Sequence, residues 1–408
     1  MRRSFISCIL LMLVSVSSAA QTLPDEPRAH GIAEQADHGG RQGEDWPTQL
    51  IGYTELRTNL VGGRHANVRT MRAAVVRGDG KERRLVAEAL AREPDSWTQF
   101  AGWAPDGKTA VINRGWEDPE NARWEEEHKQ FRFAKESWLL DAYLLDMAGG
   151  KTTNITAVER VSFYNSIFFW PNDPTKLGLT ALVNGNSHLF RMDRDGRNKV
   201  DLMKGSNEFA YGLSSSPDGK RIAYHRNYQV FLADADGSNA RRVQTGQPFN
   251  FGPSWSADGR WVLFLSGEHY NCHPYLVRAD GTGPFKLADR GGYKGVIEFL
   301  DGPDFHGGSS DVPVWSAEGK AVFYTARVGR NVELFRAALD GKTERLTHSP
   351  EGTLHYHPTP AAGGRWLVFG AKRDGVRQLF VMQLADRRVC CIRQLSAGWA
   401  AMWPHWQP

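Results

Sequence analysis

The chain has 408 residues, of which 41% are hydrophobic and 24% are charged, and its formal net charge at pH 7 is only +4. Its lysines and arginines are scattered through predicted turns and form no basic block, which argues against nucleic-acid binding. The 14 tryptophans and 42 glycines suit a sheet-rich globular protein.

The N-terminal residues read MRRSFISCILLMLVSVSSAA, with Arg2 and Arg3, an apolar stretch over 6–16 and small residues up to Ala20. This pattern predicts a secretory signal peptide over 1–20, too short to span a bilayer permanently. Residues 21–50 are polar and without periodicity, and we expect a flexible lead-in there. No later segment is apolar enough for a membrane helix. We therefore expect a mature protein in the periplasm or secreted, without a membrane span.

From residue 51 onward the chain repeats one pattern, in which an aromatic strand runs into a Trp or Ser and breaks at an Asp-Gly turn. Seven versions occur, at 100–107, 162–174, 208–219, 249–259, 311–319, 355–364 and 397–408. Those at 100–107, 208–219 and 249–259 contain Asp-Gly itself, and the one at 162–174 is degenerate. After the turns come an apolar run, a polar loop, a second alternating run and a short strand. This order predicts a four-stranded antiparallel meander, with glycine supplying the positive φ of its tight hairpins. The 40 residues from Gly219 to Gly259 are the length of one propeller blade.

The repeats predict an all-β fold: a seven-bladed β-propeller of four-stranded antiparallel blades over 51–408. The copy at 397–408 has no strands after it, and strand-like runs at 53–60, 67–80 and 82–86 supply the missing three. The N-terminal strands are therefore expected to close the last blade. Because a propeller buries its core between blades, we expect one domain, and we expect a monomer.

An insertion in the first blade, at 113–138, is acidic in its middle and rich in aromatic residues. A short helix is expected over 120–131. It is either a solvated decoration or a wall beside a binding cleft, with tryptophans available to stack on sugars.

The W-S-x-D-G turn, the aromatic strand before it and the ending L-x-x-A-D-G-x-x-x-R-R-V at 232–243 resemble TolB-type propeller repeats. The match is specific in the third to fifth blades and looser elsewhere. TolB itself carries an additional N-terminal domain, whereas only about thirty polar residues separate the predicted signal peptide from the first strand here. That departure argues against a true TolB orthologue.

Several histidines are predicted to share one rim of the propeller. In an up-and-down blade the Asp-Gly hairpins lie on one rim, and the loops before the first strand and between the second and third lie on the other. Strand alternation is expected to put His355 and His357 on one side of their strand. For His128, His348 and His405 a structural role is the preferred interpretation. The second rim is predicted to carry His225, His269, His273, His306, His355 and His357.

Each of these residues alone fits an ordinary half-buried histidine, but six from four neighbouring blades favour a cluster. Converging imidazoles with Asp304 and Asp311 nearby suit a divalent transition metal. No contiguous metal motif such as H-E-x-x-H is present.

The stretch His355-Tyr356-His357-Pro358 also resembles the H-x-H-P motif of oligogalacturonate lyases, secreted seven-bladed propellers that cleave uronic-acid oligosaccharides. In that family the motif binds Mn together with a His from an earlier blade. The resemblance implies His355 and His357 as metal ligands and His306 as the third. Asp304, His269 or His273 could complete the shell. The family's Gln three residues before the first His is Gly352 here, a departure that affects the ligand set.

A lyase must neutralise a uronate carboxylate, with a metal or an Arg, while a base removes the adjacent proton. On rim position alone, Arg226 is the predicted clamp and His269 the predicted base, with His225 second. Two functions remain open. We favour a metal-assisted polysaccharide lyase that acts on acidic oligosaccharides or polysaccharides with a divalent metal such as Mn. The alternative is a non-catalytic TolB-like scaffold that binds protein or peptidoglycan-associated partners. A serine peptidase is disfavoured because no G-x-S-x-G motif occurs.

Overall fold

The computed structural model describes residues 46–130, 132, 137–156, 162–183, 186–301, 310–392 and 395–408. The chain divides into two compact units, Met1–Ala36 and Asp37–Pro408, and every described residue belongs to the second unit. The predicted signal peptide, the N-terminal part of the lead-in, and both His306 and Asp304 lie outside the described residues.

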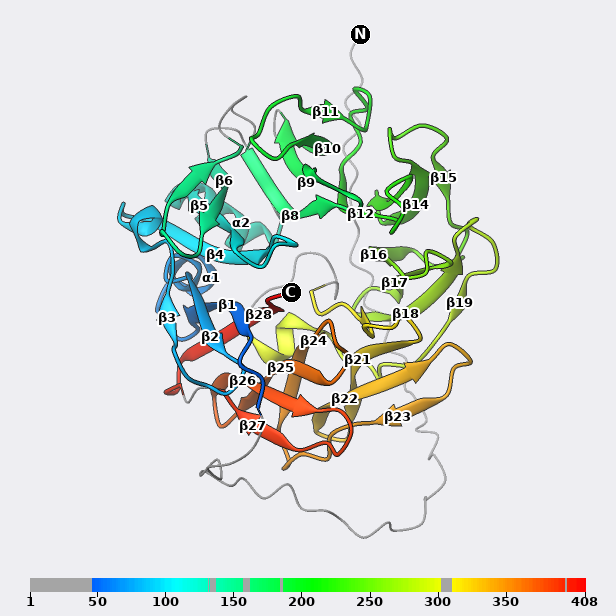
Figure 1. Cartoon of the computed structure of the whole chain (residues 1–408). Coiled ribbons are helices and arrows are strands. Elements are labelled where there is room, and N and C mark those ends of the chain that lie inside the picture. Colours follow the sequence, from blue (N-terminus) through cyan, green and yellow to red (C-terminus); the bar gives the residue numbers. More distant parts are fainter. Residues whose placement is uncertain are drawn as a thin grey trace. The chain divides into compact units, whose positions relative to one another are not determined.

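Four separate antiparallel sheets follow one another along the chain, each made of four consecutive strands (Figure 1). The first two contain β4 (Ser96–Trp103), β5 (Thr109–Glu117), β6 (Trp138–Asp146) and β7 (Thr152–Asn154), then β8 (Ser162–Trp170), β9 (Asp173–Val183), β10 (Asn186–Asp193) and β11 (Val200–Asp201). The next two contain β12 (Ala210–Ser215), β13 (Arg221–Arg226), β14 (Gln229–Asp234) and β15 (Arg241–Arg242), then β16 (Phe249–Trp255), β17 (Trp261–Glu268), β18 (Asn271–Arg278) and β19 (Phe285–Lys286).

The remaining twelve strands form one sheet that consists of three further meanders. Single parallel residue pairs join them, Val332 with Leu354 and Arg377 with Ala400. The first two meanders are β20 (Val314–Trp315), β21 (Ala321–Val328), β22 (Asn331–Ala338) and β23 (Thr343–Arg345), then β24 (Leu354–Pro360), β25 (Trp366–Arg373), β26 (Val376–Gln383) and β27 (Val389–Cys391). The third is β28 (Trp399–Trp406) with β1 (Leu50–Arg57), β2 (Arg72–Arg77) and β3 (Arg84–Leu85).

The third meander joins opposite ends of the described chain. Strand β28 pairs antiparallel with β1, from Ile51 opposite Trp406 to Arg57 opposite Trp399. The prediction of an all-β fold built from four-stranded antiparallel meanders is thus confirmed, and the N-terminal strands share a sheet with the last strand.

The first strand of each meander lies on the inside, and we call these the inner strands. They are β4, β8, β12, β16, β20, β24 and β28. Successive inner strands contact each other along most of the series, and β28 also contacts β4. In Figure 1 they lie around a common centre, with the later strands of each meander farther out.

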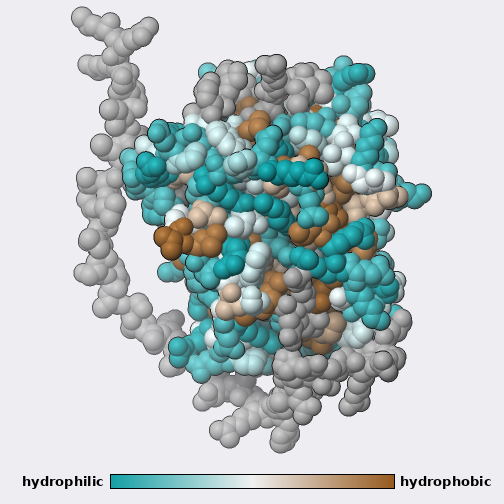
Figure 2. All heavy atoms as spheres, turned by 90° about the vertical axis from the view of Figure 1, so that its left-hand side faces the viewer, coloured by the Kyte–Doolittle hydropathy of each residue, from teal (hydrophilic) through white to brown (hydrophobic). Residues whose placement is uncertain are grey.

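The core lies between neighbouring meanders. One cluster, for example, packs Ala223 and Val230 of one meander against Val262 and Phe264 of the next, and all four are fully buried. Complete burial of a side chain such as Phe264 stabilises the fold by about 1.5–3 kcal/mol. Because each core needs two meanders, no meander is expected to be stable alone. The outer surface in Figure 2 is mostly hydrophilic, with hydrophobic residues in separate small patches.

The repeated tryptophans link neighbouring meanders on the Asp-Gly rim. Each donates its indole Nε1–H to a backbone carbonyl of the adjacent meander. The four bonds are Trp103 to His405 (3.0 Å), Trp170 to Gly219 (3.1 Å), Trp315 to Ser254 (3.1 Å) and Trp406 to Thr359 (3.0 Å). Trp255 is different, because its buried Nε1 has no hydrogen-bond partner among the described residues.

The helices are short and lie in the loops between strands: α1 (Gly63–Val68), the 3-10 helix η1 (Glu88–Ala91), α2 (Pro119–His128) and α3 (Val296–Phe299). Helix α2 falls inside the predicted insertion, close to the expected 120–131. Asp118 starts it by accepting hydrogen bonds from the backbone N–H groups of Glu120 and Asn121, with Pro119 in the first turn. No helix among the described residues is long and apolar enough to cross a membrane.

Candidate functional site

Four inner strands share an irregularity in which one residue adopts the left-handed backbone conformation. Antiparallel pairing shifts register there in β12, β16 and β24, and also where β28 pairs with β1. The left-handed residues are Gly212 (φ 67°), Gly252 (φ 55°), His357 (φ 49°) and Trp403 (φ 51°). Glycine adopts this conformation without steric cost, whereas it costs a residue with a Cβ roughly 1–2 kcal/mol.

The two strained residues that carry side chains lie next to each other. The His357 and Trp403 rings stack with centroids 5.7 Å apart, and the Trp403 backbone N–H lies 3.4 Å from His357 Nδ1. His405, two residues further along β28, has its pKa lowered to about 4 by burial and by the nearby His357. Backbone strain of this kind persists only where surrounding contacts hold it, and it concentrates at functional sites. These three residues therefore define the candidate functional site.

A buried polar network holds His357 from the backbone side. Asp311 is 1% exposed, and it accepts hydrogen bonds from the His357 N–H (2.9 Å), the Thr325 hydroxyl (2.7 Å) and the Tyr293 hydroxyl (2.9 Å). Arg290, also 1% exposed, donates to the carbonyl and the hydroxyl of Thr325. Burial and the Asp311 carboxylate raise the pKa of Tyr293 well above its usual range, so Tyr293 remains a hydrogen-bond donor.

Both ring nitrogens of His357 are engaged. Nδ1 faces the Trp403 N–H, and Nε2 lies 3.2 Å from the Ser310 carbonyl oxygen. A carbonyl can only accept, so the proton is on Nε2 and Nδ1 is the acceptor. Burial lowers the pKa of His357, which keeps the imidazole neutral at neutral pH.

His355 belongs to a different set of contacts. Its Nε2 lies 2.7 Å from the Ser349 hydroxyl and 3.5 Å from Glu333, and its ring packs edge-on against Phe369. Burial lowers the pKa of His355 to about 4, against the opposing effect of the Glu333 carboxylate. The expected alternation is interrupted, because His355 still pairs with Ala371, whereas His357 lies inside the register shift between Tyr356 and Thr359. No described contact joins His355 to His357.

The other predicted catalytic and metal residues are placed separately. His225 is buried and its Nδ1 lies 3.4 Å from the Gly252 N–H, whereas His269 is exposed and packs near Phe249 and Tyr270. Arg226 forms an ion pair with Glu208 at 3.0 Å and lies over the Phe231 ring. His273 accepts a hydrogen bond at Nδ1 from the Arg290 N–H at 3.1 Å, and burial lowers its pKa. Of these groups, His273 is joined to the His357 network, because Arg290 also forms an ion pair with Asp311 at 3.6 Å.

The metal implied by the lyase resemblance can be tested against the donor atoms. Among the described residues, no group of three or more His, Cys, Asp or Glu side chains could hold a metal ion. His357 uses both ring nitrogens, and Nε2 of His355 faces Ser349 and Glu333. These two side chains as placed do not fit a shared divalent-metal site. The predicted third ligand, His306, lies outside the described ranges, and its assignment stays a prediction.

The candidate site is covered by the connector between β19 and β20, described over 287–301 and 310–313. Phe299 of α3 is fully buried and stacks on Tyr356 with centroids 4.6 Å apart, and it meets His357 edge-on at 5.2 Å. In Figure 1 the connector, in yellow, lies near the common centre of the inner strands beside β24. The His357 imidazole is thus contacted by Trp403, Phe299 and Ser310, and it remains partly exposed.

The insertion carries an ionisable cluster that the sequence did not single out. Glu117 and Glu125 are both fully buried, and the Asn121 side chain donates to both carboxylates, at 3.1 and 3.3 Å. From α1, Arg64 approaches Glu125 at 3.4 Å and His65 approaches Glu117 at 3.3 Å. Burial, with a contribution from Glu117, raises the pKa of Glu125 to about 7. The cluster joins α1 to α2, and both of its carboxylates are buried.

The tryptophans of the same insertion are poorly suited to the expected sugar stacking. Trp138 is only 6% exposed and packs against Trp97. Trp124 already stacks on His128, and the Arg132 guanidinium lies over it at 4.6 Å.

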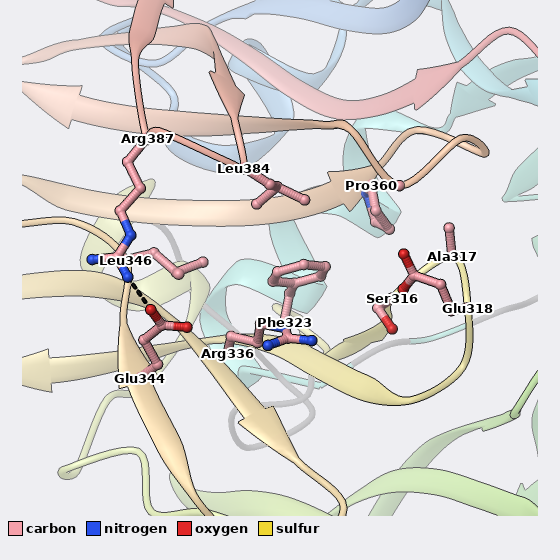
Figure 3. Close-up of a pocket in the computed structure, with 11 residues that line it drawn as sticks. Ser316, Ala317, Glu318, Phe323, Arg336, Glu344, Leu346, Pro360, Leu384 and Arg387 are labelled. Atoms are coloured by element: carbon pink, nitrogen blue, oxygen red, sulfur yellow. Dashed lines mark hydrogen bonds and ion pairs between the residues drawn. The ribbon is translucent and has the colours of Figure 1, made fainter.

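A separate pocket of about 160 Å³ lies between the β20–β23 and β24–β27 meanders (Figure 3). Phe323, Leu346, Leu384 and Pro360 form its apolar part, and the Arg387–Glu344 ion pair borders one end. Pockets for drug-sized ligands have about 300–1,000 Å³, so this one suits at most a small group. None of the predicted site residues lines it.

One sequence signal could have located the strained pair. In β16, β24 and β28 the left-handed residue precedes a proline, as Gly252-Pro253, His357-Pro358 and Trp403-Pro404. Aligning the repeats on this proline places a His and a Trp where another blade has Gly. The H-x-H-P stretch is therefore one version of a repeated bulge, which the family resemblance alone does not reveal.

Four-stranded meanders with cores between them and inner strands around a common centre define a β-propeller, and its repeats resemble those of TolB and, more weakly, those of oligogalacturonate lyases. No family model matches the chain. It is 28% identical to the uncharacterized protein Atu1656 of Agrobacterium fabrum over 109 residues, which are 26% of this chain and 36% of that protein. The matched part thus spans about a third of this curated relative.

Solved structures extend the comparison at the level of fold. An oligogalacturonate lyase in complex with manganese has a TM-score of 0.52 and 14% identity, with 85% of each chain covered. A puromycin-hydrolyzing peptidase of Mycobacterium tuberculosis has a TM-score of 0.56 and 12% identity, covering 86% of this chain and 52% of that one. TolB of Acinetobacter baumannii has a TM-score of 0.43 and 14% identity, covering 77% and 83%. At these identities the likeness is one of fold alone.

Proposed function

We propose that this protein is an exported, seven-bladed propeller that binds acidic oligosaccharides on the rim covered by the connector. The seven meanders and the pairing of β28 with β1 support the blade number and a last blade closed by N-terminal strands. Residues 1–20 act as the signal peptide, 21–50 as the lead-in, and the mature protein is a monomer in the periplasm or outside the cell.

The observation that carries the proposal is a cationic and aromatic surface at this rim. The Arg57 guanidinium lies 5.2 Å from the ring centre of Trp399, and both side chains are partly exposed. The next residue, Thr58, accepts a hydrogen bond from Arg377 at 3.2 Å. Lys372 lies directly opposite Arg377 in the antiparallel pair of β25 and β26. The Trp399 face that Arg57 does not cover suits a sugar ring, and Arg and Lys suit its carboxylate. The combination fits a uronic-acid unit better than a neutral sugar.

A polysaccharide lyase that cleaves uronic-acid chains by β-elimination is the second candidate. It is favoured by the strained His357, whose neutral imidazole lies beside Ser310 and Asp311. A base must reach the proton next to the uronate carboxylate, and both ring nitrogens of His357 are already engaged, by the Trp403 N–H and the Ser310 carbonyl. Catalysis through His357 therefore requires the Ser310 end of the connector to move. The exposed His269 has no such barrier and stays the predicted base, with Arg226 as the predicted clamp.

A binding measurement and a turnover measurement separate these candidates. Titration calorimetry with oligogalacturonate should show binding that is lost when its carboxyls are esterified. Unsaturated uronate is followed by ultraviolet absorbance on pectic and other uronic-acid polymers, with and without chelator, for the wild type, His357→Ala and His269→Ala. His128→Ala is the matched control, because His128 is exposed and stacks only on the insertion.

The outcomes separate the functions as follows. Binding without turnover supports a binding propeller, and chelator-sensitive turnover lost in His357→Ala supports the metal-assisted lyase. Turnover that survives chelation but is lost in His269→Ala supports a lyase without a required metal. If folded protein neither binds nor cleaves any acidic glycan, the proposal fails and a scaffold for protein or peptidoglycan-associated partners takes its place.

A further inference from the structure

Two cations on neighbouring strands hold one carboxylate of the connector. Lys372 Nζ lies 2.6 and 2.7 Å from the two Asp301 carboxylate oxygens, and Arg377 Nη2 lies 2.5 Å from one of them. Lys372 and Arg377 are directly opposite each other in the antiparallel pair of β25 and β26. The register of the sheet, and not the connector, therefore sets the spacing of the two charges.

The cationic side of this arrangement is buried and fixed. The Arg377 side chain is 4% exposed, and its guanidinium donates to the Phe299 carbonyl, to the Gly375 carbonyl at 3.3 Å and to the Thr58 hydroxyl at 3.2 Å. The Lys372 side chain is 19% exposed. Bidentate or multiple charge-assisted contacts of this kind are the strong ones, because their geometry is fixed before the anion arrives.

The anionic side is exposed and replaceable. The Asp301 side chain is 60% exposed, and it is held on a chain segment that lies outside every strand. A buried guanidinium without a counter-ion is unfavourable, so Arg377 needs an anion beside it whichever group supplies it.

We propose that Lys372 and Arg377 form a carboxylate-binding site that Asp301 occupies in the free protein, and that a uronate carboxylate of the ligand displaces Asp301. This inference rests on the proposed function. Trp399 and Arg57 lie on the adjoining surface, joined to the site through Thr58, and offer the aromatic face for the same sugar unit.

Displacement has a structural consequence for His357. Asp301 anchors the end of α3, and Phe299 of α3 covers the His357 ring. Arg327 also binds this helix through Glu298, and Lys372 and Arg377 donate to the Glu298 and Phe299 carbonyls, so the ion pair of Asp301 is one of several ties at this end. A ligand carboxylate that takes the place of Asp301 releases one of these ties and loosens the cover over the candidate site.

The test uses titration calorimetry of the full mature chain with digalacturonate and with its methyl ester. Asp301→Asn removes the internal competitor and keeps both cations, and we expect roughly tenfold tighter binding of digalacturonate. Lys372→Met removes one cation, and we expect at least tenfold weaker binding. Glu351→Gln is the matched control, because Glu351 is an exposed acid paired with Arg330 at 3.1 Å on the neighbouring hairpin. It should leave the affinity unchanged.

Hydrogen exchange supplies a readout that a purely structural ion pair would not give. Digalacturonate should reduce amide protection over 296–301 in the wild type, and Asp301→Asn should show reduced protection without ligand. If digalacturonate binds but Asp301→Asn and Lys372→Met both match the wild type, this inference is wrong and the proposed function stands. If no folded variant binds digalacturonate, both this inference and the proposed function are wrong. Thermal unfolding of each variant establishes that it is folded, and Asp301→Asn still tests the site if Lys372→Met does not fold.

Discussion

Two pairs of neighbouring inner strands accommodate the same bulge with different residues. In β12 and β16 the left-handed positions are Gly212 and Gly252, whereas in β24 and β28 they are His357 and Trp403. On the glycine side the backbones pack closely, since a Cβ added to Gly212 would lie 3.7 Å from the Gly252 Cα atom. On the other side two rings stack and the connector lies over them.

The comparison shows where this fold departs from its own repeat. A glycine at a left-handed position follows from backbone sterics alone and needs no functional explanation. A histidine and a tryptophan there are maintained against a steric cost, by the Asp311 network and by their mutual stacking. The histidine and tryptophan at these positions, and not the bulge that all four strands share, identify the part of the propeller on which experiments should concentrate.

The largest expected effect is on the glycine side. Gly212→Ala combines a left-handed backbone with a Cβ 2.6 Å from the buried His225 Nδ1, and should reduce the free energy of unfolding by about 3 kcal/mol. Gly205→Ala is the control, because Gly205 is also left-handed (φ 78°) but nothing lies within 4 Å of the added Cβ. It should cost only about 1 kcal/mol. Denaturant unfolding measures both, and equal losses would contradict the role of close packing.

The next effect tests strain on the His357 side. Both His357→Ala and His357→Gly lose the stacking and hydrogen bonds of the imidazole, but only alanine keeps the strained Cβ. We expect His357→Gly to be more stable than His357→Ala by about 1 kcal/mol, the reverse of the usual order within a strand. The comparison by chemical denaturation needs no further control. An alanine variant as stable as the glycine variant would show that the left-handed conformation at this position is not maintained.

A smaller effect concerns the tryptophans that link the meanders. Trp406→Phe removes part of a buried ring and also the hydrogen bond to the Thr359 carbonyl. Trp255→Phe removes the same part of a buried ring but no hydrogen bond, because the Trp255 Nε1 has no partner among the described residues, and should therefore cost about 1 kcal/mol less than Trp406→Phe. Thermal or denaturant unfolding of the two variants gives the difference. Equal destabilisation would mean that ring packing, and not the hydrogen bond, holds neighbouring meanders.

The smallest effect is the pH dependence that His405 contributes. Burial, with repulsion from His357, lowers the pKa of His405 from 6.5 to about 4. As pH falls below 6.5 the unfolded chain takes up a proton before the folded protein does, so stability decreases towards about pH 4. Between pH 8 and pH 6 the loss should be less than about 1 kcal/mol. Unfolding at several pH values should show a shallower acid dependence in His405→Gln, and an unchanged slope would rule out this contribution.

Sequence patterns predicted the repeat and its strands because Asp-Gly turns and alternating runs are local signals. Strand β16 and the turn at Gly259 lie where the repeat places them, and the ends of α2 lie one and three residues from its expected bounds. The pairing of the N-terminal strand with β28 could be predicted by counting the strands in the repeats, without knowledge of any contact.

The candidate site was less accessible to sequence reasoning, because the contacts that decide it join distant segments. His357 and Asp311 are 46 residues apart, and nothing local indicates that an aspartate would bind the histidine backbone. Alternation suggested that His355 and His357 share a face, but a bulge changes the count by one and is invisible without comparing the repeats. The carboxylate held by Lys372 and Arg377 comes from a connector outside the repeat altogether.

The pairing of β28 with β1 also sets a limit on when this protein can finish folding. Ile51 meets Trp406 in that pair, so strand β1 has no neighbour on one side until almost the whole chain has been synthesised. Contacts between such distant residues form slowly, and an unpaired strand edge is prone to join other chains while it waits. The same strand pair that completes the last meander thus exposes the newly made chain to aggregation until its final strand arrives.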